Sequence, residues 1–335
     1  MLEMVPGSYD PDVATALNNL GLLYRKQGRY TDAERLYKRA LAMQRKALRP
    51  DYPDIAISLN NLAALYDQQG RYADAEPLFR QVLATRRRTL GEEHPDTLAT
   101  GHRLAWLFGR QGRYTEALEL VGKVLGGRRH TLGDDHPDTL AARETLAWLT
   151  GLRGKLAEAE ELCRSVLADR RRVLGAQHPD TLATRATLAW LTERQGRHAD
   201  AERQYRDVLA DRRRILGDQH PDTLTTRQDL ARIIGLQRHF TESEQLCRDV
   251  LADRRRVLGD DHPDTLASRA ALAWLAARRG RRDEAEEIYR QVLADRTRVL
   301  GSSHPDTEAT RSELTELTAD RGTVHPGAEA PYSAT

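Results

Sequence analysis

Residues 179–220 read PDTLATRATLAWLTERQGRHADAERQYRDVLADRRRILGDQH, and the next residue, Pro221, starts the same pattern again. Pro179 and Asp180 suit the first turn of a helix, where proline lacks only an unused N–H and an acid meets the positive helix end. Leucine and alanine then recur at helical spacing until the break at 195–197. A second amphipathic run follows and stops at Gly217, a typical residue after a helix end. The stretch predicts a helical hairpin.

The same hairpin is repeated along the chain without insertion or deletion. A proline returns every 42 residues, at Pro11, Pro53, Pro95, Pro137, Pro179, Pro221, Pro263 and Pro305. A fixed period of this length indicates units that bury their apolar faces against neighbouring units. Glycine marks the turn inside most units, and Arg238 takes its place in the sixth.

The repeat predicts an all-α fold, a right-handed superhelical solenoid of antiparallel helix pairs. We expect an N-terminal tail (1–9), seven 42-residue repeats (10–304), a capping helix (305–321) and a disordered tail (322–335). The last helix is unusually polar, as the solvent-facing end of such an array must be.

Composition and charge narrow the function classes. The net charge of +2 gives little attraction for nucleic acid or anionic membranes. No apolar run could span a bilayer and the N-terminus does not resemble a signal peptide, so we expect a cytoplasmic protein. No phosphate-binding loop is present, and every candidate catalytic residue is repeated in phase. We therefore expect no enzyme, no cofactor and no metal site.

The two cysteines and the repeated histidines have structural interpretations. Cys163 and Cys247 share one phase with Tyr37 and Phe79, which predicts small buried side chains too far apart for a disulfide. A histidine precedes the helix-opening Pro-Asp in six units, and one histidine per unit cannot assemble a metal site. We interpret this series as a repeat-boundary device, at His94, His136, His178, His220, His262 and His304.

Leu17, Leu20, Gly21, Tyr24, Ala33, Tyr37 and Ala40 reproduce the spacing of the tetratricopeptide signature. With its 42-residue unit and sequence segments such as residues 54–63 and 69–78, the chain resembles kinesin light chains over about residues 10–321. This resemblance implies that first helices line a concave groove for extended peptides. It also implies that paired asparagines contact the ligand backbone, and the matching residues are Asn18, Asn19, Asn60 and Asn61. Later units carry other residues at these positions.

All four tryptophans fall at one phase of the repeat, and Arg232 takes that phase in the sixth unit. In the tetratricopeptide family this phase points into the groove, so one interpretation is an aromatic ladder for ligand side chains. The other is packing that replaces the volume of lost core tyrosines. The ladder would comprise Trp106, Trp148, Trp190 and Trp274, with Arg232 between the last two.

Arginines form two further series. We interpret the first as stems that pack while their guanidinium groups reach acids of the adjacent unit, at Arg143, Arg185, Arg227, Arg269 and Arg311. Groove contacts to an acidic ligand are the alternative. The second comprises runs such as 170–172 that end second helices, where cations complement the negative helix end.

The pattern favours a protein-binding scaffold that holds a protein or peptide ligand in its groove. We expect a monomer. The alternative is a regulatory array that self-associates or docks onto a STAND-type ATPase, since similar arrays form the sensor ends of such enzymes.

Overall fold

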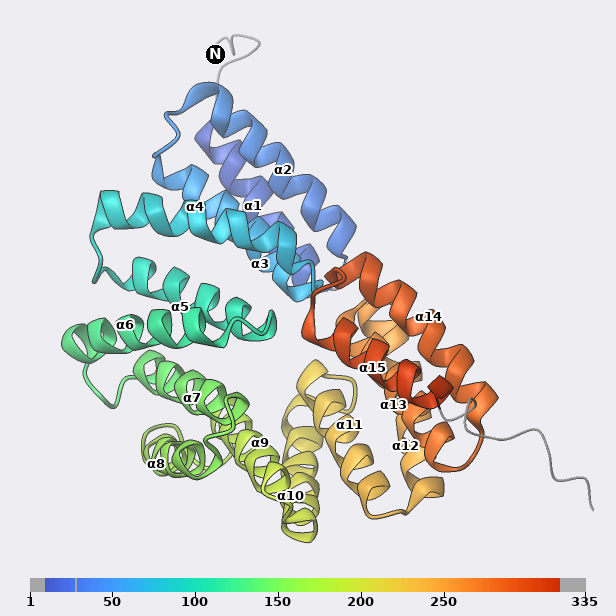
Figure 1. Ribbon diagram of the computed structural model, residues 1–335. Helices are drawn as coiled ribbons and strands as arrows, with labels where there is room; N and C mark the ends of the chain where they lie inside the picture. Colours follow the sequence, from blue (N-terminus) through green and yellow to red (C-terminus); the bar gives the residue numbers. More distant parts are fainter. Residues whose placement is uncertain (1–9, 28, 320–335) are drawn as a thin grey trace, which may run out of the picture.

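The computed structural model describes residues 10–27 and 29–319, and fifteen helices lie within them (Figure 1). Their bounds are α1 Pro11–Lys26, α2 Tyr30–Ala47, α3 Pro53–Gln68, α4 Tyr72–Leu90, α5 Pro95–Arg110, α6 Tyr114–Leu132, α7 Pro137–Leu152, α8 Leu156–Val173, α9 Pro179–Arg194, α10 His198–Leu216, α11 Pro221–Leu236, α12 Phe240–Leu258, α13 Pro263–Arg278, α14 Arg282–Leu300 and α15 Pro305–Ala319. No strand occurs in this part of the chain, so the all-α prediction is confirmed.

Consecutive helices pair into units, which we number from the first (α1, α2) to the seventh (α13, α14), with α15 as the first helix of an eighth. Gly196, with φ of 78°, makes the turn between α9 and α10 in the left-handed region that glycine adopts without steric cost. Arg238 accepts φ of 67° at the equivalent position of the sixth unit. The 42-residue sequence period is thus a structural period.

The apolar faces of the two helices meet inside each unit and against the next one. Tyr37, Phe79, Cys163, Tyr205 and Cys247 all occupy one phase on second helices, and all are fully buried. The predicted packing role of the two cysteines is therefore confirmed. Burial raises the pKa of Cys163 to about 12 and that of Cys247 to about 11, which leaves both as inert thiols.

First helices line the inner side of the curved array. Successive first helices such as α7 and α9 contact one another as well as their own partners, as expected for the shorter, inner side of a curved stack. Second helices form the outer layer, and the chain curls until α13–α15 lie beside α2–α4 (Figure 1). The hand of the superhelix stays a prediction.

Two of the predicted segments lie outside the described residues, namely the tails at 1–9 and 322–335. Helix α15 ends at Ala319, and the proposed cap at 305–321 is described only to that residue. In the described part of the chain, no helix combines the length and apolar character needed to cross a membrane.

Candidate functional site

Three of the four tryptophans lie on first helices against a glycine of the preceding first helix. A Cβ atom added to Gly109 would lie 2.6 Å from Cζ3 of Trp148. The same contact recurs between Gly151 and Trp190, at 2.9 Å, and between Gly235 and Trp274, at 3.1 Å. An added methyl group would overlap the indole at Gly109 and Gly151 and would press against it at Gly235.

These rings are accessible as well as packed. Trp106 is 40% exposed, and its ring is tilted by 30° against that of Trp148 with 4.3 Å between centroids. Trp148, Trp190 and Trp274 are half-buried. The structure therefore brings two of the four together as a pair, while the later two stand separately. Their half-burial combines features of both sequence interpretations.

Arg232, the residue at the tryptophan phase of the sixth unit, makes ion pairs of its own. Its guanidinium contacts the carboxylates of Glu193 and, at 3.0 Å, Asp229. Glu193 is only 6% exposed and occupies the position that glycine takes in the neighbouring pairs. Burial raises the pKa of Asp229 to about 7, against the opposing effect of Arg254 and Arg212.

The four asparagines differ in accessibility. Asn18 is buried, and its amide nitrogen donates to Ser58 Oγ at 2.8 Å and to the carbonyl of Ala14 at 3.2 Å. Its amide oxygen accepts from Asn61 Nδ2 at 3.5 Å. Asn60 and Asn61 are half-buried, and Asn19 is exposed. Asn18 thus uses its hydrogen-bonding groups for contacts to its own helix and to the second unit.

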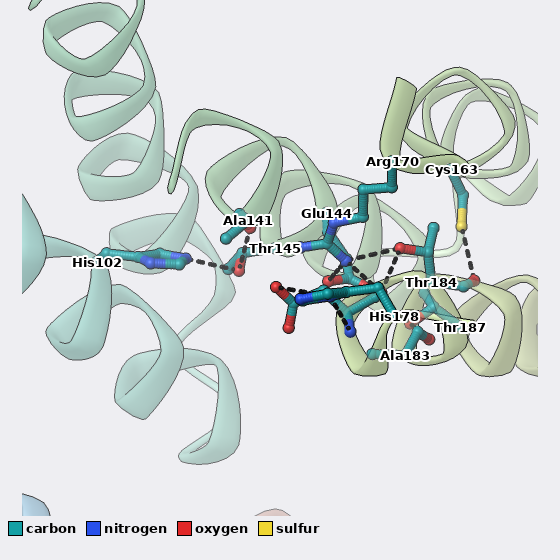
Figure 2. A network of polar contacts seen from close by, with 11 residues as sticks. His102, Ala141, Glu144, Thr145, Cys163, Arg170, His178, Ala183, Thr184 and Thr187 are labelled. Atoms are coloured by element: carbon teal, nitrogen blue, oxygen red, sulfur yellow. Dashed lines mark hydrogen bonds and ion pairs between the residues drawn. The ribbon is translucent and has the colours of Figure 1, made fainter. Parts of the chain in front are cut away.

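Units three to five replace these asparagines with a polar network on the inner face (Figure 2). Thr145 Oγ1 donates to the carbonyl of Ala141, so its oxygen accepts from His102 Nε2 at 2.8 Å. His102 Nδ1 in turn accepts from Arg128 Nη1 at 3.1 Å. Burial, followed by the nearby Arg128 cation, lowers the pKa of His102 to about 3, so the imidazole stays neutral.

Arg170 occupies the centre of the second half of this network (Figure 2). It is 2% exposed, and its Nη1 donates to Glu144 Oε2 at 2.6 Å, Thr184 Oγ1 at 2.6 Å and the carbonyl of Asp180 at 2.8 Å. Burial raises the pKa of Glu144, and the Arg170 cation opposes that shift. This charge pair holds α7, α8 and α9 together.

The arginine runs at the ends of second helices do more than complement a helix dipole. The first arginine of most runs points inward and donates to the first turn of the next unit, as Arg212 does to the carbonyl of Asp222 at 2.8 Å and to Thr226 Oγ1 at 2.6 Å. Sequence reasoning missed this role, although the repeated Thr or Ser five residues after the proline was a visible signal. The remaining arginines of the runs are exposed, except for Arg87, which is half-buried.

The other arginine series is structural as expected, but its partner was wrongly placed. Arg185 Nη1 contacts Asp211 Oδ2 at 2.6 Å and Arg227 Nη1 contacts Asp253 Oδ2 at 2.7 Å. Each acid lies on the second helix of the same unit rather than on the adjacent unit, because the arginine stem follows the inner surface of its own hairpin. The same pairing joins Arg143 to Asp169 and Arg269 to Asp295, whereas Arg311 donates to the carbonyl of Ser302.

The histidine series caps helices. In each first helix from α5 to α13, the histidine before the proline accepts from the backbone N–H of the following aspartate, as His178 Nδ1 does from Asp180 at 3.2 Å. This bond satisfies one of the N–H groups that a helix start leaves open. The described residues contain no group of three or more His, Cys, Asp or Glu that could hold a metal ion.

A cavity of about 400 Å³ lies where the concave faces of the first three units meet the starts of α11 and α13. Trp106 lines it, together with charged residues of both signs. Arg103 is exposed and makes no ion pair with any other described residue. The full lining is Arg25, Ala64, Asp67, Gln68, Tyr72, Arg103, Trp106, Arg110, Pro221, Asp222, Leu258, His262 and Asp264.

The repeat geometry and the inner layer of first helices define a helical-repeat solenoid. The chain matches the tetratricopeptide repeat family over residues 12–88, 68–129, 110–162, 151–214 and 233–298, and it belongs to that family. The coarse functional class is accordingly a protein-interaction scaffold. The comparison with curated proteins returns no match.

Among solved structures, the chain is similar to a predicted kinesin light chain of Podosopora anserina with nearly identical TPR-like repeats. The two are 31% identical over 62% of this chain and 98% of the other, with a TM-score of 0.51. The apo form of RapI is 14% identical over 84% and 97% of the two chains, with a TM-score of 0.60. A Rap protein complexed with competence and sporulation factor is 9% identical over 92% and 98%, with a TM-score of 0.57. The Rap proteins show the fold alone.

Proposed function

We propose that this protein binds an extended segment of a partner protein in the concave groove formed by its first helices. The proposed contact residues are Asn18, Asn19, Asn60, Asn61, Trp106, Trp148, Trp190, Arg232 and Trp274. Within this set, Trp106 and Trp148 form the centre. Asn18 contributes indirectly, by holding Asn61 in place.

The carrying observation is the exposed, paired indole of Trp106 beside the 400 Å³ cavity. Exposed aromatic rings that are held by packing bury large apolar area on binding at little entropic cost. Arg103 supplies a cation beside the ring, three residues away on the same helix. An inner wall with this composition suits a segment that places an apolar side chain against the indole pair.

The fold supports the same proposal. Each first helix adds an equivalent row of inner side chains, so an extended chain can meet several successive units. Affinity then accumulates over many weak contacts. The Podosopora anserina neighbour shares this repeat type.

A displayed library of random peptides tests the proposal. Peptides selected on the wild-type protein should lose at least tenfold in affinity for the Trp106→Ala/Trp148→Ala variant. The matched control is Tyr52→Ala, because Tyr52 is a 48% exposed aromatic residue outside the cavity lining. Equal binding by all three proteins, or no selectable peptide at all, would contradict groove binding.

The alternative is a regulatory array that acts by self-association or by docking onto a STAND-type ATPase. Light scattering at several concentrations separates self-association from the groove proposal. A mass that stays at one chain, 37.8 kDa, supports the groove proposal. A defined oligomer whose formation covers the concave face would favour the alternative.

A further inference from the structure

Units five apart in the sequence touch each other where the chain curls round. The turn glycine Gly70 lies against Pro263, whose Cγ would be 2.0 Å from an added Cβ. Gly112 lies against Pro305 in the same way, at 2.5 Å. Both pairs are separated by the same number of residues, since 263 − 70 and 305 − 112 are equal. We call these two contacts and their surroundings the seam, and Figure 1 shows α13 and α15 beside α3 and α4 there.

Polar and aromatic contacts complete the seam. His262 Nδ1 accepts from the N–H of Asp264, so its Nε2 donates to the carbonyl of Gln68 at 2.8 Å. His304 stacks on Tyr72 with 5.9 Å between ring centroids and 20° between planes. Arg110 donates to Tyr72 Oη at 3.0 Å and lies 3.8 Å from Asp264.

The equivalent histidines of other units show that His262 and His304 differ from the rest of the series. Side chains of His136, His178 and His220 are 40%, 40% and 41% exposed, whereas those of His262 and His304 are 10% and 6% exposed. All five belong to the same His-Pro-Asp motif and cap their helices in the same way. Only the contact between turns of the superhelix buries the last two.

We infer that the seam is a reversible clasp, which holds successive turns of the solenoid together and must open to admit a partner segment to the concave channel. The cavity beside Trp106 is walled on one side by α11 and α13, so closure narrows the approach to the indole pair. The seam is also small, since no described helix packs along a helix of the other turn in the way that consecutive helices pack along each other. A small contact made of polar groups and single rings suits an interface that opens reversibly.

Acid should open the clasp. Burial lowers the pKa of His262 and of His304 below the ordinary value of 6.5. The closed state therefore binds protons less readily than the open state. The free energy that favours the closed state is fully present above pH 6.5 and declines as the pH falls. Asp264, Arg110 and Arg254 face His262, and Asp306, Arg110 and Arg296 face His304. A second cavity, which His262 also lines, has further charged or titratable residues in its wall, namely Tyr30, Arg71, Asp74, Asp261 and Arg298.

Paired glycine substitutions test the clasp without changing charge. Gly70→Ala/Gly112→Ala places methyl groups against Pro263 and Pro305. The control is Gly196→Ala/Gly280→Ala, because these glycines also have positive φ but face open space. Small-angle scattering at pH 7.5 should show a larger radius of gyration for the seam variant and the wild-type value for the control. Equal radii for both variants would overturn the clasp.

The histidines are tested by a second matched pair. Wild-type protein should expand between pH 7.5 and pH 5.5, and His262→Gln/His304→Gln should reduce that expansion at least twofold. His136→Gln/His178→Gln should leave it unchanged. Resonance energy transfer between labels on Ala73→Cys and Ser303→Cys, exposed neighbours of the stacked pair, should fall in step with expansion. Expansion that is the same in both histidine variants would overturn their role.

Partner access rests on the proposed function, whereas the scattering measurements do not. If the protein opens as described but binds no displayed peptide, the clasp proposal stands and the groove proposal fails. Peptides that bind the wild type and the opened glycine variant at equal rates would show instead that the clasp does not control access.

Discussion

Arg232 forms an ion pair with Glu193 at the position where neighbouring units place a tryptophan over a glycine. The separation along the chain is the same in each case, since 232 − 193 equals 190 − 151 and 274 − 235. Both residues of the contact differ from those of the neighbouring units: arginine replaces tryptophan, and glutamate replaces glycine. Consecutive first helices therefore make this contact in one of two ways, with a tryptophan over a glycine or with an arginine paired to a glutamate.

This contact predicts coupling between its two residues. Arg232→Ala should lower the free energy of unfolding by about 1–3 kcal/mol, because the buried carboxylate of Glu193 loses its cation. Glu193→Gly/Arg232→Trp should recover much of that loss by rebuilding the arrangement of the neighbouring units. Urea denaturation of the single and double variants gives the coupling energy, expected at about 0.5–3 kcal/mol. Additive effects would contradict the pairing.

Two glycines on adjacent helices should respond oppositely to the same substitution. Gly109→Ala should destabilise the protein by up to about 1–3 kcal/mol, because the new methyl group overlaps the ring of Trp148. Gly122→Ala should stabilise it by about 1 kcal/mol, because an exposed helical glycine faces open space. Thermal unfolding followed by circular dichroism measures both. Stabilisation by both substitutions would mean that Trp148 moves aside without cost.

Replacement of a buried arginine should cost more stability where a carboxylate lies beside it. Arg170 and Arg212 make the same contacts to the next helix, but Glu144 lies beside Arg170 and Ala186 stands at the equivalent position near Arg212. Arg170→Ala should cost about 3–5 kcal/mol, because it leaves the carboxylate of Glu144, whose side chain is only 17% exposed, without its cation. Arg212→Ala should cost about 1–3 kcal/mol. Urea denaturation at pH 7 would contradict this ranking if the two losses were equal.

The same variant should acquire a pH dependence. Burial already raises the pKa of Glu144, and removing Arg170 takes away the cation that opposes this shift. The folded state then binds a proton more readily than the unfolded state, so stability is highest at low pH and falls as the pH rises. Arg170→Ala should therefore gain stability between pH 8 and pH 5 relative to Arg212→Ala. Parallel curves for the two variants would show that Glu144 is hydrated after the substitution.

Removal of one whole unit, residues 179–220, should leave a folded protein. Each unit contacts mainly its neighbours, so the remaining helices can pack in the same way with slightly lower stability. Helical circular dichroism per residue should stay unchanged. In the shortened array Pro305 takes the place of Pro263 opposite Gly70, because the deletion restores the same separation along the chain. Collapse of the helical signal would contradict a solenoid of nearly independent units.

Much of the site could be read from the sequence because the repeat puts equivalent residues in equivalent places. The shared phase of Trp106 and Trp148 predicted a common face, but their stacking depends on the rotation between two units. The partners of Arg185 and Arg170 required the tertiary structure, since a long arginine side chain can reach its own hairpin or the next one. Likewise, Asn18 and Asn19 are adjacent in sequence, and only packing shows that one is buried and the other exposed.

The sequence by itself determined the helical hairpins, their length and their number, because proline at a helix start and glycine at a turn act through local backbone conformation. It also determined which residues recur together. Only the tertiary structure decided that Gly70 meets Pro263 and that two of the repeated histidines are buried. Those contacts depend on the pitch of the superhelix, which sums small rotations over five units, and no single repeat encodes that sum.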